Sequence, residues 1–192
     1  LLGLTNDAFG YILTKVDFNS FHAYKYISRT SLGEQTGEIL IQNALEMIKN
    51  AKRPLLLCGN GIHLSKSEEL LKNLIAKLNI PVVLPDAAKD LIAEDHPLYM
   101  GIFGTAGQRR ANFAVQNSDC ILSLGAGLCI KKVGFNYKGF APNAKKIIVD
   151  IDEGQLFHQV LTPDLPIQAD VRFFMEEMLE QLNTVTVESP AK

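Results

Sequence analysis

The chain has no tryptophan, only three cysteines and no long hydrophobic run. The cysteines are widely spaced and form no CxxC pair, and Cys58 and Cys120 lie within short apolar runs. We therefore expect reduced, buried thiols of a cytosolic protein. No apolar run approaches the roughly 18 residues of a membrane helix, and no signal-peptide pattern opens the sequence. These absences predict a cytoplasmic protein with no membrane partner.

A strong charge of either sign is also missing. The net charge is -2, and 21% of the residues are charged, so the chain lacks the basic field that a nucleic-acid partner would need. With 192 residues, 47% of them hydrophobic, the chain can build one substantial core without a disulfide or a metal. We expect an ordinary globular fold and no nucleic-acid partner.

No catalytic or metal-binding pattern stands out. The four histidines form no HxH or HxxxH spacing, and no serine lies in a GxSxG turn. We expect structural or solvated roles for the histidines, including His63. Nucleophilic partners can meet in space from distant positions, so the absence of a motif argues only weakly against such catalysis.

From Glu34 onward, helical periodicity alternates with short apolar runs. Ser65 and Glu68 form a capping-box pair that we expect to open the second helix. The alternation predicts an α/β fold with a parallel sheet and helices on both faces. The expected helices cover residues 34–51, 65–78, 107–117, 153–160 and 171–183, and the expected strands cover 55–58, 81–84, 120–124, 147–149 and 166–169.

The two ends differ in texture from this regular part. Residues 1–33 contain many of the aromatic residues without clean periodicity, which indicates a linker arm that packs on a neighbouring surface. Residues 184–192 are predicted to form a flexible tail, and residues 34–183 to form the domain itself. Because Leu1 is not a start methionine, we expect an excised piece of a longer protein.

Three glycine clusters lie at or just past the ends of short apolar runs. They are Gly59-Asn60-Gly61, Gly101 to Gly107, and Gly125-Ala126-Gly127. Ligands of open α/β sheets bind outside the carboxyl ends of the strands, where backbone without Cβ can approach a phosphate. The clusters predict a nucleotide-type platform. For the first cluster, ligand contact and a plain tight turn both stay open, since Leu64 replaces the third glycine of GxGxxG.

Charged residues beside these clusters allow two interpretations each. Arg109 and Arg110 in the first turn of a helix suggest an anionic partner, or one of them pairs with a carboxylate. Asp150 and Asp152 at a strand end could accept ribose hydroxyls or cap the following turn. Asp170 is predicted to cap the last helix.

Three segments in order resemble the central domain of thiamine-diphosphate-dependent enzymes of the acetolactate synthase type. They are AKRPLLLCGNGI, LNIPVVLPDAAKDLIAEDHPLYMGIFGTAGQRRANFAVQNSDCILSLGAGL, and FAPNAKKIIVDIDEGQL with DLPIQADV. The resemblance covers about residues 37–182. It implies a three-layer, Rossmann-like α/β fold with a six-stranded parallel sheet and helices on both faces.

The resemblance also implies a larger parent enzyme. Such an enzyme has three α/β domains, and the two flanking domains, absent here, bind thiamine diphosphate and Mg²⁺. The parent would act as a transferase or lyase that decarboxylates a 2-oxo acid and adds the product to an acceptor carbonyl. It would form a homo-oligomer, a dimer or tetramer, and this chain alone would be inactive.

In such families the central domain binds FAD, ADP or nothing, and the resemblance assigns positions to the ligand. The implied contacts are Gly59, Asn60, Gly61, Gly101, Ile102, Phe103, Gly104, Thr105, Gly125, Ala126, Asp150, Ile151, Asp170 and Val171. No residue is assigned to catalysis or to a metal.

This chain departs from the family pattern at two places. Gly127 replaces an arginine that lies along the flavin, and Cys129 and Lys131-Lys132 replace the Asp and Arg that follow. Pro85-Asp86 replaces a Thr-Leu pair. Loss of an arginine contact weakens binding about tenfold or more, so FAD and ADP both stay open.

Two other functions compete with this interpretation. The glycine clusters alone fit a stand-alone adenine-nucleotide or flavin-binding module, or an electron-transfer module. The departures at Pro85 and Gly127 fit a structural spacer domain that has lost its ligand.

Overall fold

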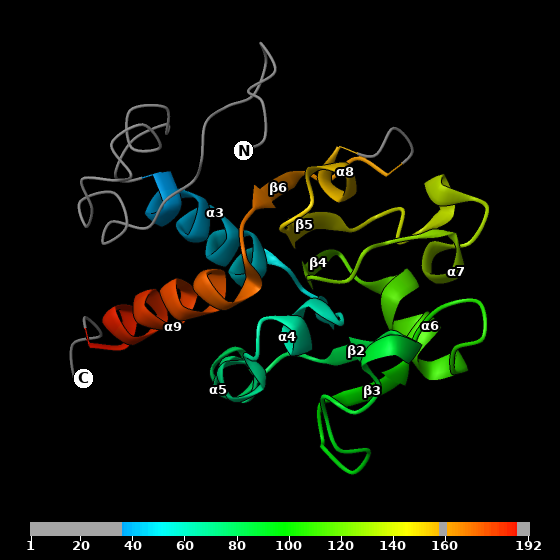
Figure 1. Cartoon of the computed structure of the whole chain (residues 1–192), viewed down its shortest axis with the longest axis horizontal. Coiled ribbons are helices and arrows are strands. Elements are labelled where there is room, and N and C mark those ends of the chain that lie inside the picture. Colours follow the sequence, from blue (N-terminus) through cyan, green and yellow to red (C-terminus); the bar gives the residue numbers. More distant parts are fainter. Residues whose placement is uncertain (1–35, 158–160, 188–192) are drawn as a thin grey trace.

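The fold is a six-stranded, all-parallel sheet with helices on both faces, as the computed structural model shows for residues 36–157 and 161–187 (Figure 1). The strand order is β3-β2-β1-β4-β5-β6. This confirms the predicted three-layer α/β, Rossmann-like class. The strands are β1 (Pro54–Cys58), β2 (Val82–Leu84), β3 (Tyr99–Ile102), β4 (Cys120–Leu124), β5 (Lys145–Asp150) and β6 (Leu165–Gln168).

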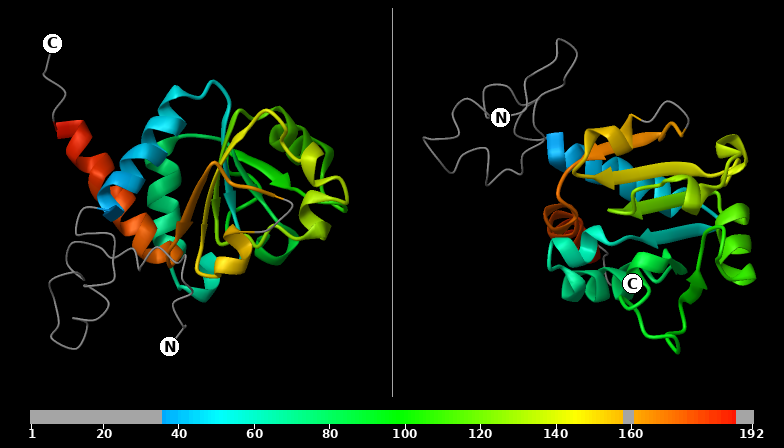
Figure 2. Two further views of the ribbon diagram at one scale, coloured as in Figure 1. Left: turned by 90° about the horizontal axis from the view of Figure 1, so that it is seen from above. Right: turned by 45° about the vertical axis from the view of Figure 1, so that its right-hand side comes forward.

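Three long helices cover one face of the sheet, with α9 in contact with both α3 and α5 (Figure 2, left). These are α3 (Thr36–Asn50), α5 (Glu68–Leu78) and α9 (Val171–Val187). Shorter elements pack against the other face or join the strands: α4 (Gly61–Leu64), η2 (Asp86–Ala88), α6 (Arg109–Asn117), α7 (Ile130–Val133), η3 (Tyr137–Gly139) and α8 (Glu153–Leu156). None of the helices in the described residues is long and apolar enough to span a membrane.

Alternate residues of each strand build two separate cores. In β1, Leu56 and Cys58 join the core under α3, α5 and α9, whereas Leu55 and Leu57 join the core under α6 and α8. Side chains in a strand point to opposite faces, so a strand buried on both faces must be apolar at every position. This is why the central strands are continuous apolar runs.

The sheet reverses its strand order between β1 and β4. Both strands run parallel in register, with Cys58 opposite Leu124, so they end at the same level. The loops that begin at Gly59 and Gly125 therefore lie next to each other at the carboxyl edge. This is the position at which doubly wound folds bind ligands.

The structure corrects the expected loop around Gly101. Gly101 and Ile102 belong to β3, which pairs with β2 with a register shift between Val82 and Val83. Gly101 has a φ of +107°, a conformation that glycine adopts without strain. Because β3 is short and contains a glycine, its sequence is typical of a loop, and the apolar pattern of the sequence did not predict a strand there.

The predicted capping box is wrong. Helix α5 begins at Glu68 after Ser67, whose side chain makes no capping hydrogen bond. Ser65 instead ends α4, and its hydroxyl donates to the carbonyl of Ile62. Because the short helix α4 lies between β1 and α5, helix α5 begins three residues later than expected.

Other boundaries differ in small ways. Helix α6 begins at Arg109 rather than near residue 107, and α9 continues to Val187, beyond the expected end near residue 183. The predicted arm at 1–33 and part of the helix expected at 153–160 lie outside the described residues, as do 188–192 of the predicted tail.

Candidate functional site at the carboxyl edge

The loops after β1 and β4 pack directly against each other. The N–H of Gly59 donates to Leu124 O at 2.8 Å, and the N–H of Gly61 donates to Gly125 O at 3.0 Å. A Cβ on Gly59 would lie 2.1 Å from the Cα of Ala126, and one on Gly61 would lie 2.8 Å from the Cα of Gly125. Both glycines are therefore required by contact between two backbones.

The loop after β1 has few donors left for a ligand. Gly59 and Gly61 donate to the neighbouring loop, and the N–H of Ile62 donates to Gly59 O at 3.2 Å. The first turn of α5 carries Glu68 and Glu69, whose charge repels an anion. Of this cluster, Asn60 keeps a side chain without a hydrogen bond among the described residues. The loop is glycine-rich, as phosphate-binding loops are, but most of its backbone N–H groups are not available to a phosphate.

The loop after β4 has the opposite polarity. The carbonyl of Gly125 accepts from Gly61, and those of Ala126 and Gly127 accept from the ammonium of Lys132. The N–H groups of Ala126, Gly127 and Leu128 donate to none of the described residues. The C=O and N–H of a trans peptide point in opposite directions, so these three N–H groups point away from the groups that hold the carbonyls.

The conformation of this loop resembles an anion-binding turn. Gly125 and Gly127 have φ values of +55° and +51°. Successive N–H groups beside left-handed residues can form a concave surface that binds anions. Of the two glycine clusters at the switch point, this one leaves three successive N–H groups without a partner in the described part of the chain.

The glycine loop after β3 is hydrogen-bonded to the neighbouring helices α6 and α7. Asn112 of α6 accepts from the N–H of Gly104 at 2.9 Å and donates to its carbonyl at 3.0 Å. Thr105 donates to Lys131 O through its N–H and its hydroxyl, and buried Phe103 donates to Leu84 O. The structure thus links this loop to α7 rather than to the loop after β1.

The arginines at the start of α6 pair with aromatic rings. The guanidinium of Arg109 lies 5.2 Å from the ring centroid of Phe113, and that of Arg110 lies 6.0 Å from that of Tyr99. Neither forms an ion pair with a carboxylate among residues 36–157 and 161–187. Of the two interpretations of these arginines, pairing with a carboxylate is not seen among those residues, and an anionic partner stays a prediction.

The aspartates at the ends of β5 and β6 serve as local caps. Asp150 accepts from the N–H of Asp152 at 3.1 Å, and Asp152 accepts from Gly154 at 2.9 Å at the start of α8. Asp170 accepts from the N–H of Arg172 at 2.8 Å, which confirms its predicted role at the start of α9.

The two hydrophobic neighbours of these aspartates differ. Val171 is buried, and its Cγ1 would lie 3.2 Å from a Cβ on Gly125, so it lines the junction of the loops after β1 and β4. Ile151 is largely exposed. The structure therefore brings together Gly59, Gly61, Gly125, Ala126 and Val171. Among the positions from Gly101 to Thr105, Phe103 shares a core cluster with Ala126, and Thr105 is hydrogen-bonded to Lys131 of α7.

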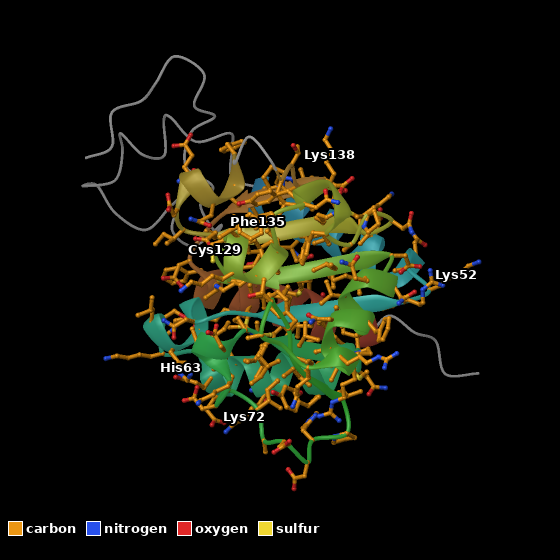
Figure 3. The ribbon with its side chains drawn as sticks, turned by 90° about the vertical axis from the view of Figure 1, so that its right-hand side faces the viewer. Lys52, His63, Lys72, Cys129, Phe135 and Lys138 are labelled. Atoms are coloured by element: carbon orange, nitrogen blue, oxygen red, sulfur yellow. The ribbon has the colours of Figure 1, made fainter. Side chains whose placement is uncertain are left out.

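Three positions beside the site were not predicted as contacts: Lys132, Asn112 and Gln155. Gln155 of α8 lies beside Gly127, with its Oε1 3.6 Å from where a Cβ would be. The sequence offered a signal only for Lys132, as a departure from the family pattern. Figure 3 places Lys52, just before β1, on one side of the molecule, and Cys129 and His63, which follow β4 and β1, on the other.

A histidine bridge lies beside the loop after β1. His63 Nδ1 is 2.8 Å from Glu68 Oε1, and Nε2 is 3.1 Å from Asp90 Oδ1. The hydrogen bond with Glu68, aided by Asp90, raises the pKa of His63. The pKa of Glu68 is lowered by its own backbone N–H and then by His63, and that of Asp90 by His63. The bridge joins α4, α5 and the segment after η2, as expected of a structural histidine.

The cysteines differ sharply in environment. Cys58 and Cys120 are buried, and burial raises the pKa of both thiols, that of Cys120 to about 11. Cys129, directly after the loop at β4, is exposed. No group of three or more potential ligands for a metal ion occurs among the described residues.

The sequence of the chain is similar to those of known proteins. The family described as "Thiamine pyrophosphate enzyme, central domain" matches residues 41–182. The chain is 37% identical to a probable acetolactate synthase large subunit of Methanococcus aeolicus over 145 residues, covering 76% of this chain and 24% of that protein.

Further relatives show the same partial coverage. The chain is 34% identical to the acetolactate synthase isozyme 1 large subunit of Escherichia coli (strain K12), covering 74% of this chain and 24% of that protein. It is 32% identical to 2-hydroxyacyl-CoA lyase 1 of Dictyostelium discoideum, covering 79% and 25%. The chain thus spans about a quarter of the length of these relatives. It belongs to the family of thiamine pyrophosphate enzyme central domains.

Proposed function

We propose that this chain is the central part of an acetolactate synthase-like enzyme that decarboxylates a 2-oxo acid and adds the product to an acceptor carbonyl. The observation that carries the proposal is the match over residues 41–182, together with 37% identity to a probable acetolactate synthase large subunit. The glycine clusters alone had left a stand-alone nucleotide-binding module open, and the family match favours the central domain instead.

Thiamine diphosphate and Mg²⁺ belong, in this proposal, to flanking parts of the longer enzyme. Thiamine diphosphate supplies the carbanion chemistry when it is bound. The chain by itself is then inactive, and we infer a cytoplasmic homo-oligomer as the working form.

The experiment uses the whole gene product that contains this chain. We expect thiamine-diphosphate- and Mg²⁺-dependent release of CO₂ from a 2-oxo acid by the whole protein and none by the chain alone. Size-exclusion chromatography with light scattering tests the oligomeric state. A gene product without flanking α/β domains, or a whole protein whose CO₂ release ignores thiamine diphosphate, would contradict the proposal.

We further propose that the carboxyl edge binds FAD or ADP through the loop after β4. The fit differs between the loops. Around Gly59 the N–H groups of Gly59, Gly61 and Ile62 donate within the protein, whereas three successive N–H groups, those of Ala126, Gly127 and Leu128, have no partner among the described residues and can donate to diphosphate oxygens. Asn60 and the exposed Ile151 remain at the same edge as candidates for peripheral contacts.

Thermal unfolding of the full chain with FAD, ADP and NAD tests this part. A ligand at 100 times its Kd stabilises the folded state by about 2.7 kcal/mol, which moves the midpoint by several degrees. We expect a shift with FAD or ADP. A shift with neither would overturn nucleotide binding while leaving the family assignment untouched.

A further inference from the structure

Lys132 holds the loop after β4 from behind. Its ammonium donates to the carbonyl of Ala126 and to that of Gly127, the latter at 3.0 Å. The side chain is half-buried, so these bonds are partly shielded from water. Hydrogen bonds from a charged donor are about twice as strong as neutral ones. Lys132 is thus the side chain that engages both carbonyls of this turn.

The backbone around Lys132 is fixed independently of the loop. The N–H groups of Lys132 and Val133 donate to Cys129 O at 2.8 and 3.0 Å, and Val133 is buried in the core. On the other side, the carbonyl of Lys131 accepts from Thr105. Short helix α7 is therefore tied to both glycine loops, and the ammonium starts from a defined position.

The direction of the peptide groups connects Lys132 to binding. One ammonium engages the carbonyls of Ala126 and Gly127, so the N–H groups of Gly127 and Leu128, which belong to the same two peptide units, both point away from it. If the ammonium is removed, the carbonyl of Ala126 loses its donor, whereas that of Gly127 keeps the N–H of Cys129 at 2.8 Å. The peptide unit between Ala126 and Gly127 is then free to rotate. The N–H of Gly127 would then no longer be held in the same direction as that of Leu128.

We propose that Lys132 is a positioning residue that sets the loop Gly125–Leu128 so that its N–H groups can bind the diphosphate of a nucleotide. The inference rests on the proposed nucleotide binding. It assigns Lys132 a place behind the loop, with its donors directed to the protein, rather than in contact with the phosphate. The ligand class is an adenosine diphosphate group, alone or as part of FAD.

The test compares Lys132→Met, Lys132→Arg and Lys131→Met in the full chain. Lys131→Met is the matched control, because it removes the same charge from the neighbouring exposed residue, whose side chain has no hydrogen bond among the described residues. Two quantities are measured: hydrogen exchange of the Gly61 and Cys129 amides without ligand, and the Kd for ADP. Both amides donate to loop carbonyls in the native chain.

We expect Lys132→Met to speed exchange at Gly61 and Cys129 by about tenfold and to weaken ADP binding by about tenfold. Lys132→Arg should restore both in large part, and Lys131→Met should change either by less than about threefold. This joint change in a ligand-free and a ligand-bound measurement supports a positioning role.

Three results would overturn the inference. Weaker ADP binding with unchanged exchange would mean that Lys132 contacts the phosphate directly. Faster exchange with unchanged ADP binding would separate the loop from the ligand, and no change in either would remove Lys132 from the site. If the unaltered chain binds neither ADP nor FAD, the proposed nucleotide binding is wrong. If, in addition, Lys132→Met leaves amide exchange unchanged, Lys132 does not position the loop either.

Discussion

The loops after β1 and β4 have almost the same glycine pattern and opposite hydrogen bonding. In the loop at Gly59-Asn60-Gly61, the N–H groups of both glycines donate to the neighbouring loop. In the loop at Gly125-Ala126-Gly127, the carbonyls are engaged, and the N–H groups of Ala126 and Gly127 are unpaired among the described residues. One loop gives most of its donors to the fold, whereas the other leaves successive donors that, in our proposal, bind a ligand.

This difference shows that a glycine cluster does not by itself mark a phosphate site. Glycine allows close approach of any group, and at Gly59 and Gly61 that group is the backbone of the next loop. What separates packing from binding is where the backbone donors go.

The largest expected contrast is in thiol reactivity, because a cysteine lies next to each loop. Cys58 ends β1 and is buried, whereas Cys129 follows the second loop and is exposed. We expect Cys129 to react with a thiol reagent in the native chain, and Cys58 and Cys120 to react roughly a thousandfold more slowly, after opening. Timed labelling with mass spectrometry measures this. Rapid native labelling of Cys58 would mean that the β1 edge is open.

Gly59→Ala should destabilise the chain by about 3 kcal/mol or more, because the new Cβ would lie 2.1 Å from the Cα of Ala126. Urea unfolding measures the change. Gly154→Ala is the matched control: its Cβ meets only the side chain of Asp152, at 3.2 Å, and we expect a change within about 0.5 kcal/mol. Equal, small effects would contradict the close packing of the two loops.

Gly127→Ala should cost less, about 1 kcal/mol. Gly127 has a φ of +51°, which strains any other residue, but its Cβ would approach nothing closer than 3.6 Å. An arginine at this position, as in the family pattern, would carry the same backbone strain. Denaturant unfolding of Gly127→Ala beside Gly59→Ala ranks the two sites. A larger loss at Gly127 than at Gly59 would reverse the comparison.

The smallest expected effect is the pH dependence of the bridge at His63. A raised pKa of His63 stabilises the folded state below the ordinary pKa, and this contribution is lost as the pH rises through the folded value. The lowered pKa values of Glu68 and Asp90 make their contribution disappear as the pH falls through theirs. The bridge should therefore be strongest at mildly acidic pH.

Urea unfolding of the native chain and of His63→Gln checks this window. We expect the native chain to be the more stable at about pH 5.5, and the difference to shrink by about pH 9. The groups are largely exposed, so the difference should be small. A difference that grows toward alkaline pH would contradict the assigned bridge.

The sequence predicts most of the fold because buried parallel strands must be apolar on both faces. Leu55–Cys58 and Cys120–Leu124 show this pattern, and both are strands. The strand Tyr99–Ile102 lacks it, since Gly101 interrupts the run and the pairing with β2 is irregular. Local periodicity does not reveal a strand whose edge position and register depend on its neighbour.

The site was predicted at the level of its edge but not of its hydrogen bonds. The spacing of Gly59 and Gly61 indicates a loop without showing that Gly125 fills the space beside it. The carboxylate of Glu68 fits a capping box in sequence and instead contacts His63, which Asp90 reaches from 27 residues away. Such partners are set by the packing of the loops, so no local pattern encodes them.

The most direct test follows the backbone amides of both loops by ¹⁵N NMR while ADP is added to the full chain. We predict the largest chemical-shift changes at Ala126, Gly127 and Leu128, with the amides of Gly59 and Gly61 changing little because they already donate within the protein. Saturation of the first set alone would support binding at the loop after β4. Changes concentrated at Gly59 and Gly61, or at neither loop, would contradict it.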